Sequence, residues 1–203
     1  MNTVIGLGTW AFGRDYWQDQ DQGSSIRTIH RALKEGITYF DTAQVYGKGT
    51  SEQIPGQQLR RFRRTIPRHR LTIDTKIMLH PQLDAQGFRK AVEKSLRRLC
   101  VSYIDTCYIH WPLGGFNYPP VLDVLEQLKR EQIIMHIGVS NFPADLTVFV
   151  ADRWPVSDYQ GAYSLIWRKP EEALIPLCRS RGIRFTAYSI LAQGILADTP
   201  FPP

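Results

Sequence analysis

The sequence lacks the usual features of membrane-spanning, secreted and zinc-binding proteins. It contains no run of about 18 or more apolar residues, which a membrane-spanning helix would need. Its amino-terminal end lacks the charged and apolar regions of a signal peptide. Only three cysteines are present, Cys100, Cys107 and Cys178, and their spacing suggests neither a disulfide framework nor a metal site. We therefore expect a soluble, cytoplasmic protein without a bound metal.

The composition is that of a packed globular domain. Of the 203 residues, 43% are hydrophobic and 11% are aromatic, which is ample for a core and argues against disorder. One large domain accommodates this length more readily than two small ones. We therefore predict a single domain over residues 1–203.

Positive charge is in moderate excess. The chain has 25 Lys and Arg against 19 Asp and Glu, a net charge of +6, and the densest basic stretch covers residues 60–70. Such a stretch could bind the phosphates of a nucleic acid, or it could be the solvated end of a helix, where cations complement the helix dipole. No array of stacking aromatics and no groove-binding motif accompanies it. The second interpretation is favoured, and we predict no nucleic-acid partner.

Strand-like apolar runs alternate with amphipathic helical patterns along the chain. The apolar spacing predicts helices at residues 24–35, 51–62, 85–99, 119–131, 144–151 and 171–181. The β-branched and aromatic runs predict strands at residues 4–7, 38–41, 71–76, 104–110, 137–140, 159–162 and 184–188. This alternation is typical of βαβ units around a parallel sheet.

Two α/β architectures contain such a sheet. An open, doubly wound sheet that binds a dinucleotide carries G-x-G-x-x-G after its first strand. Gly6 and Gly8 are present here, but Ala11 stands at the third position and a long loop precedes the first helix. Seven repeats in series favour instead a TIM (β/α)8-type barrel, with about seven of the eight strands present in this sequence.

Ionisable residues recur where the predicted strands end. Asp41 ends the second strand, Lys76 the third and His110 the fourth, and Tyr46 lies in the loop after Asp41. In a barrel these ends share one face, where active sites lie. Each residue also has a structural explanation, since Lys76 could pair with Asp74, His110 could be a satisfied core histidine and Tyr46 an ordinary turn residue. Their coincidence at one face favours a functional cluster.

This combination of side chains suits proton donation to a carbonyl oxygen. A phenol with a pKa near 10 donates poorly at neutral pH, but a neighbouring ammonium lowers that pKa and a carboxylate holds the ammonium charged and oriented. Tyr46, Lys76 and Asp41 would then form a tuned general acid. His110 would hydrogen-bond the same substrate oxygen, as a donor or as a proton relay. A carbonyl polarised in this way accepts hydride, which proteins take from a nicotinamide cofactor.

Short motifs spread along almost the whole chain also carry a family resemblance. In order they are Gly8-Thr9-Trp10, Phe40-Asp41-Thr42-Ala43, Tyr46-Gly47, Ser51-Glu52, Thr75-Lys76, Ser95-Leu96-Arg97-Arg98-Leu99, Tyr103-Ile104-Asp105, His110-Trp111-Pro112, Gly138-Val139-Ser140-Asn141-Phe142 and Tyr188-Ser189. With this order the sequence resembles the aldo-keto reductase family, including its voltage-gated potassium channel β-subunit branch.

The resemblance implies roles for individual residues. Asp41, Tyr46, Lys76 and His110 match the family's catalytic tetrad. Trp10 and Trp111 would line the substrate pocket together with Tyr46 and His110. The cofactor, NADP with NAD as the less common choice, would be bound by Thr9, Trp10, Asp41, Ser140, Asn141, Gln160, Tyr188, Ser189, Leu191, Gln193, Gly194 and Leu196.

The sequence departs from the family pattern in two places. Ile190 follows the Tyr-Ser pair where the family usually has proline. The sequence also lacks the family's seventh helix, eighth strand, eighth helix and adenosine-binding segment. We expect weaker cofactor binding from this, and exposed strand edges through which the barrel could oligomerise.

Three functions are compatible with these observations. The first is NADP(H)-dependent reduction of an aldehyde or ketone to an alcohol, with Tyr46 as the general acid and a small carbonyl compound as substrate. The second is a catalytically impaired or regulatory subunit built on the same fold. The third is a truncated fragment that acts as a binding module. The intact tetrad favours the first, and the length favours the third.

Overall fold

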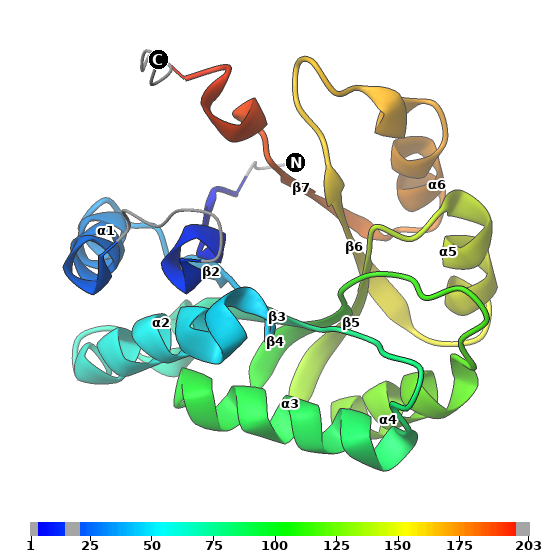
Figure 1. The fold of residues 1–203 in the computed structure, drawn as a ribbon, viewed down its shortest axis with the longest axis horizontal. Helices are drawn as coiled ribbons and strands as arrows, with labels where there is room; N and C mark the ends of the chain where they lie inside the picture. The colour runs from blue at the N-terminus through cyan, green and yellow to red at the C-terminus, as the bar shows by residue number, and fades with distance from the viewer. Residues whose placement is uncertain (1–3, 15–20, 198–203) are drawn as a thin grey trace.

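The computed structural model describes residues 4–14 and 21–197 and contains one parallel sheet (Figure 1). Each strand pairs with the next along the chain, so the strand order is the sequence order. The strands are β1 (Gly6–Gly8), β2 (Tyr39–Asp41), β3 (Thr72–Ile77), β4 (Ile104–Ile109), β5 (Ile134–Ser140), β6 (Val156–Ala162) and β7 (Arg184–Tyr188).

Six α-helices among the described residues connect these strands and cover the outside of the sheet (Figure 1). They are α1 (Gln22–Lys34), α2 (Thr50–Arg61), α3 (Ala85–Leu99), α4 (Pro119–Arg130), α5 (Ala144–Ala151) and α6 (Leu174–Ser180). Short 3-10 helices lie in the connections: η1 (Trp10–Gly13), η2 (Tyr46–Gly49), η3 (Arg68–Arg70), η4 (Lys169–Glu171) and η5 (Ala192–Gly194). None of the described helices is long and apolar enough to cross a membrane.

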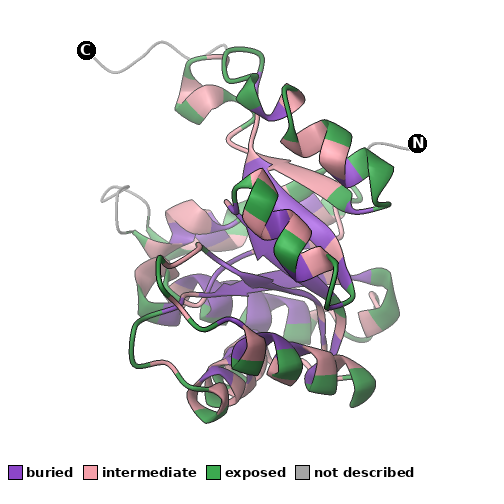
Figure 2. Ribbon diagram, turned by 90° about the vertical axis from the view of Figure 1, so that its right-hand side faces the viewer, coloured by how far each residue is buried: buried purple, intermediate pink, exposed green. Residues whose placement is uncertain are grey.

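The sheet curves into a nearly closed barrel in which β1 and β7 stand at the two ends of the strand order. Buried residues are concentrated in the strands and on the inward faces of the helices, while the outer helix faces are exposed (Figure 2). The prediction of an incomplete (β/α)8-type barrel with seven strands is therefore confirmed. Its geometry brings the carboxyl ends of all the strands to one face.

Side-chain capping explains where two of the helices, α1 and α3, begin. The carboxylate of Asp84 accepts a hydrogen bond of 2.7 Å from the Gly87 amide and caps α3 at the predicted residue. The first helix begins before the predicted Ser24, because the carboxylate of Asp21 accepts a 2.6 Å bond from the Ser24 amide. Capping by an upstream aspartate therefore adds residues to α1 that the serine pattern left out.

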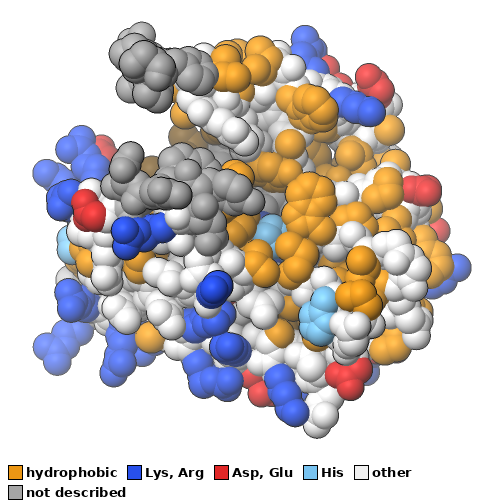
Figure 3. All heavy atoms as spheres, in the orientation of Figure 1, with side chains coloured by type: hydrophobic (Ala, Val, Ile, Leu, Met, Phe, Trp, Pro, Cys, Tyr) orange, Lys and Arg blue, Asp and Glu red, His pale blue; other side chains and the backbone are white. Residues whose placement is uncertain are grey.

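The basic stretch at residues 60–70 contains the end of α2, a turn and η3. Arg60 and Arg61 lie in the last turn of α2, where cations complement the helix dipole. Arg68 pairs with Asp105 at 2.5 Å, and its guanidinium lies over the Tyr103 ring. On the face seen in Figure 3, basic side chains gather over the side of the molecule formed by α1, α2 and α3. This arrangement supports the interpretation of the stretch as a solvated helix end.

Candidate active site

The ends of three neighbouring strands and one loop bring four ionisable side chains together. Asp41 is the last residue of β2, Lys76 lies near the end of β3, His110 follows β4 directly, and Tyr46 begins η2. The Lys76 ammonium donates to Asp41 Oδ2 at 2.7 Å and to the Thr42 carbonyl at 2.8 Å. The side chain of Lys76 is only 2% exposed and that of Asp41 is 19% exposed. The cluster therefore rests on a buried ion pair.

The alternative pairing of Lys76 with Asp74 does not occur. Asp74 Oδ2 accepts a hydrogen bond of 2.7 Å from the Tyr39 hydroxyl, and Oδ1 accepts one of 2.9 Å from the Thr106 amide. Both partners lie inside the barrel on the strands beside β3. The ammonium of Lys76 is thus committed to Asp41, on the face where the strands end.

Tyr46 faces both Lys76 and His110. Its hydroxyl lies 3.4 Å from His110 Nε2, and the two rings meet edge to face with centroids 5.5 Å apart. The Lys76 ammonium is 5.4 Å from the centroid of the Tyr46 ring. The ring of Trp10 lies 6.1 Å from the Tyr46 ring, centroid to centroid. The phenol is therefore enclosed by a cation, an imidazole and an indole.

The net pKa of Tyr46 differs from the expectation. Burial raises the pKa of this phenol, and the charges of Asp41 and Tyr188 act in the same direction. The Lys76 ammonium lowers it, as expected, but burial is the larger effect and the pKa stays above its ordinary value. The prediction of a lowered pKa was wrong, because the sequence could not show how far the phenol is buried. At neutral pH the phenol keeps its proton.

Lys76 and His110 differ in charge, since Lys76 is positively charged and His110 is neutral. Burial is the largest single effect on the pKa of Lys76 and works against its ammonium. The charges of Asp41, Tyr46 and Asp74 and the hydrogen bond to Asp41 together outweigh it, so the pKa of Lys76 is raised and the group stays charged. Burial, reinforced by the charge of Lys76, lowers the pKa of His110 to about 3, and its imidazole is neutral at physiological pH. The cluster thus combines a permanent cation with a neutral ring.

The surroundings of His110 also favour one tautomer. Its Nδ1 is buried and has no hydrogen-bond partner. A proton on that atom would be a buried N–H group without an acceptor, which is rarer in proteins than an acceptor without a donor. The proton is therefore best placed on Nε2, the nitrogen that faces Tyr46. His110 then donates a hydrogen bond toward the same point as the phenol.

A second polar group adjoins the tetrad on β5, β6 and β7. Gln160 Nε2 donates to Asp41 Oδ1 at 2.7 Å, which links residues 119 positions apart. Asn141 Nδ2 donates to the His110 carbonyl at 3.1 Å and to Ser140 Oγ at 3.0 Å. The Tyr188 hydroxyl donates to Asn141 Oδ1 at 2.7 Å. Gln160 and Asn141, two of the residues expected to bind nicotinamide, are therefore hydrogen-bonded directly to a tetrad residue. Ser140 and Tyr188 are connected to the tetrad through Asn141.

The other expected site residues occupy varied positions. Thr9 is fully buried, and its hydroxyl donates to the Asp41 carbonyl at 2.9 Å, so its side chain supports β2. Trp111 is 47% exposed. In its described part, residues 189–197, the segment after β7 forms no hydrogen bond with the tetrad, and several of its residues have left-handed backbone angles. Its expected site residues are Ser189, Leu191, Gln193, Gly194 and Leu196.

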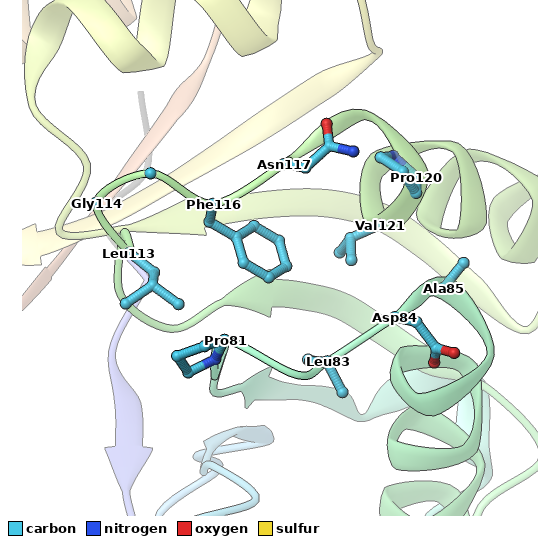
Figure 4. Close-up of a pocket in the computed structure, with 11 residues that line it drawn as sticks. Pro81, Leu83, Asp84, Ala85, Leu113, Gly114, Phe116, Asn117, Pro120 and Val121 are labelled. Atoms are coloured by element: carbon cyan, nitrogen blue, oxygen red, sulfur yellow. The ribbon is translucent and has the colours of Figure 1, made fainter.

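A cavity of about 530 Å³ lies beside the loop that follows His110. It is formed between the β3–α3 loop and the β4–α4 loop, with Leu113 and Phe116 on one side and Pro81 and Leu83 on the other (Figure 4). Its walls are mainly apolar, with the Asp84 carboxylate at one end. The cavity is separate from the tetrad, and sequence patterns gave no indication of it.

The buried carboxyl of Asp74 predicts a specific pH dependence of stability. Burial raises its pKa to about 7, above the unfolded value near 4. Between about pH 4 and pH 7 the unfolded chain loses this proton while the folded chain keeps it. The contribution of Asp74 to the free energy of unfolding therefore falls as pH rises, by up to ~1.4 kcal/mol per pH unit.

Replacing Asp74 by asparagine removes that titration. We expect the stability of Asp74→Asn relative to the parent chain to increase from pH 4 to pH 7, measured by urea unfolding at several pH values. Asp145→Asn, on the exposed start of α5, is the matched control and should show no such trend. A stability difference independent of pH for Asp74→Asn would show that the carboxyl is ionised throughout.

The fold and the site together define a (β/α) barrel with a Tyr–Lys–Asp–His cluster at its carboxyl-terminal face. A family model described as "Aldo/keto reductase family" matches residues 4–200. The chain belongs to the aldo-keto reductase family. This agrees with the resemblance drawn from the sequence motifs.

Curated relatives are longer than this chain. Aldo-keto reductase YhdN of Bacillus subtilis is 36% identical over 200 residues, which is 95% of this chain and 59% of the relative. The NADH-specific methylglyoxal reductase of Escherichia coli is 35% identical over 217 residues, covering 96% of this chain and 65% of the relative. The chain thus spans about three fifths of the length of these relatives.

Solved structures of aldo-keto reductases are also longer than this chain and superpose on nearly all of it. An aldo-keto reductase from Bacillus halodurans, in its holo form, superposes with a TM-score of 0.83 at 26% identity, over 98% of this chain and 65% of that one. An aldo-keto reductase from Klebsiella pneumoniae in complex with NADPH superposes with a TM-score of 0.81 at 30% identity, over 96% of this chain and 66% of that one.

Proposed function

We propose that this chain catalyses the reduction of an aldehyde or ketone with a nicotinamide cofactor, and that Tyr46 is the general acid. The observation that carries the proposal is the convergence of two proton donors on one point. The Tyr46 hydroxyl and His110 Nε2 are 3.4 Å apart, close enough for both to hydrogen-bond a carbonyl oxygen placed beside them. The buried Lys76–Asp41 pair lies behind the phenol.

Each tetrad residue has a distinct part in the proposed reaction. His110, neutral and protonated on Nε2, donates a hydrogen bond that orients the carbonyl and increases its polarity. Tyr46 transfers its proton to the oxygen as negative charge develops there. The Lys76 ammonium stabilises the phenolate that remains, which offsets part of the effect of burial on the pKa of Tyr46. Asp41 keeps that ammonium charged and fixed in place.

The polar side chains beside the tetrad fit the carboxamide group of a nicotinamide cofactor. When such a cofactor is bound, its reduced nicotinamide ring supplies the hydride. Ser140, Asn141 and Gln160 offer hydroxyl and amide groups at the ends of β5 and β6. Gln160 uses its amide nitrogen to bond Asp41, so its amide oxygen is the atom suited to accept from a carboxamide N–H. Tyr188, at the end of β7, supplies an aromatic ring at the same face.

Both nicotinamide cofactors are reasonable candidates. The E. coli relative is named for NADH and methylglyoxal, whereas the K. pneumoniae structure contains NADPH. We propose NADP(H) as the cofactor and a small carbonyl compound, such as a 2-oxoaldehyde, as the substrate. A comparison of NADPH with NADH is therefore part of the test.

Cofactor binding can be measured by titrating NADPH or NADH against the purified chain and recording nicotinamide fluorescence. We expect saturable binding, weakened about fivefold in Gln160→Met, since this variant loses one or two hydrogen bonds at similar side-chain volume. Gln127→Met on the exposed face of α4, where the side chain of Gln127 donates a hydrogen bond to Glu131, is the matched control. The proposal would be contradicted if neither NADPH nor NADH bound at concentrations up to about 0.5 mM. That result would mean a binding free energy weaker than ~4.5 kcal/mol for both cofactors.

A further inference from the structure

The segment that follows Tyr46 has an unusual backbone. Gly47, Lys48 and Gly49 are three consecutive residues with positive φ, at 55°, 54° and 101°. Glycine adopts this conformation readily, but lysine does so at a cost in free energy. A strained residue of this kind persists only where its surroundings hold it. Something outside the segment must therefore stabilise the loop that carries the proposed acid.

Arg98, from the end of α3, contacts this segment at Lys48 and Gly49. One guanidinium nitrogen donates to the Lys48 carbonyl at 2.9 Å, and another donates to Glu52 Oε2 at 3.1 Å. The guanidinium also packs so closely against Gly49 that a Cβ at that position would collide with it. A planar group with several fixed donors suits this double contact better than an ammonium would.

Glu52, on α2, connects Arg98 to strand β3. Its side chain is fully buried, and that of Arg98 is 13% exposed. Its second oxygen, Oε1, accepts a hydrogen bond of 2.7 Å from the hydroxyl of Thr75, the neighbour of Lys76 on β3. A buried carboxylate is stable only when it is paired and hydrogen-bonded, and these partners satisfy it. One ion pair thus connects α3, the Tyr46 loop and the strand that carries Lys76.

We propose that Arg98 and Glu52 form a positioning pair that sets the distance between Tyr46 and Lys76. Neither residue touches the tetrad side chains, so neither is a catalytic residue. The pair acts by holding the loop on one side and β3 on the other. The inference rests on the proposed function, in which the proximity of the ammonium to the phenol governs proton transfer.

Hydrogen exchange tests the positioning role without any requirement for activity. In Arg98→Ala we expect the amides of residues 46–50 to exchange about tenfold faster, while those of β4 remain protected. Arg89→Ala is the matched control, because Arg89 lies on the same helix and pairs with Glu131 and Glu93 on the exposed side. Unchanged exchange at residues 46–50 in Arg98→Ala would overturn the proposal.

Kinetics then separate positioning from simple stabilisation. At a temperature where Arg98→Ala is fully folded, we expect kcat for carbonyl reduction to fall at least tenfold, with the Kd for NADPH within twofold of the parent. Guanidinium ion at millimolar concentration should restore part of kcat in this variant and have no such effect on Arg89→Ala. Arg98→Lys, a milder change that keeps the charge, should fall between the parent and Arg98→Ala.

The outcomes distinguish this inference from the proposed function. Faster exchange at residues 46–50 with an unchanged kcat would show that the pair stabilises the loop without positioning Tyr46, and would overturn the proposal. If the parent chain bound cofactor but reduced no carbonyl compound, the proposed function would fail. The exchange measurement would still decide whether Arg98 holds the segment.

Discussion

Replacing Tyr46 by phenylalanine is expected to reduce carbonyl turnover by about a thousandfold while leaving cofactor affinity nearly unchanged. The substitution removes only the hydroxyl, which lies 3.4 Å from His110 Nε2, and keeps the ring that packs against Trp10 and His110. His110 is not expected to take over as the acid, because burial lowers its pKa to about 3 and leaves its imidazole neutral. The measurement is kcat with NADPH and an aldehyde, together with the Kd for NADPH.

A matched tyrosine provides the control. Tyr163 lies in the connection after β6, where its hydroxyl donates a hydrogen bond to Glu171, which is not a tetrad residue. Tyr163→Phe should therefore retain turnover. Substantial turnover in Tyr46→Phe would show that the proton comes from another donor and that the acid is wrongly assigned.

Removing the ammonium with Lys76→Met is expected to lower both turnover and stability. The phenolate of Tyr46 would lose its stabilising cation, so we expect kcat to fall by about a hundredfold or more. Asp41 would lose its ion-pair partner in a largely buried position, and breaking one side of a buried pair typically costs about 3–5 kcal/mol of stability. The stability effect comes from the 2.7 Å bond between Lys76 Nζ and Asp41 Oδ2. The effect on turnover comes from the position of the same ammonium 5.4 Å from the centroid of the Tyr46 ring.

The double variant Asp41→Asn with Lys76→Met separates these two effects. With both charges removed, no unpaired carboxylate remains, and part of the stability lost in Lys76→Met should return. Turnover should stay low, because the ammonium is still absent. If turnover recovered together with stability, the ion pair would have only a structural role. Thermal unfolding and kcat, measured on the same samples, decide between the two.

The sequence predicted the positions of those elements that local signals define. The helices α3 and α5 and the strand β7 begin and end at the predicted residues. The strands β5 and β6 begin three residues earlier than predicted. Pairing with neighbouring strands extends them, as between Ile104 and Ile134, and a pattern read along one segment does not contain that contact. The last helix is shorter than predicted, because the 3-10 helix η4 ends at Glu171 and a turn over residues 172–173 precedes the start of α6 at Leu174.

The candidate site was predictable in its residue types but not in its energetics. Asp41, Tyr46, Lys76 and His110 could be selected because each lies at or near the end of a predicted strand. The bond from Gln160 to Asp41 joins residues too distant in sequence for any local pattern to reveal. The roles of Glu52 and Arg98 were hidden for another reason, since charged residues on helices are normally solvated. Their burial became visible only in the structure.

The most direct test of the proposed function is deuterium transfer. The purified chain would be incubated with benzaldehyde and NADPH carrying deuterium at the transferred C4 position, and the alcohol analysed by mass spectrometry. We predict that the parent chain forms benzyl alcohol with one deuterium on its carbinol carbon, and that Tyr46→Phe forms almost none. A parent chain that binds NADPH but yields no deuterated alcohol from benzaldehyde or from a 2-oxoaldehyde would contradict the proposed function.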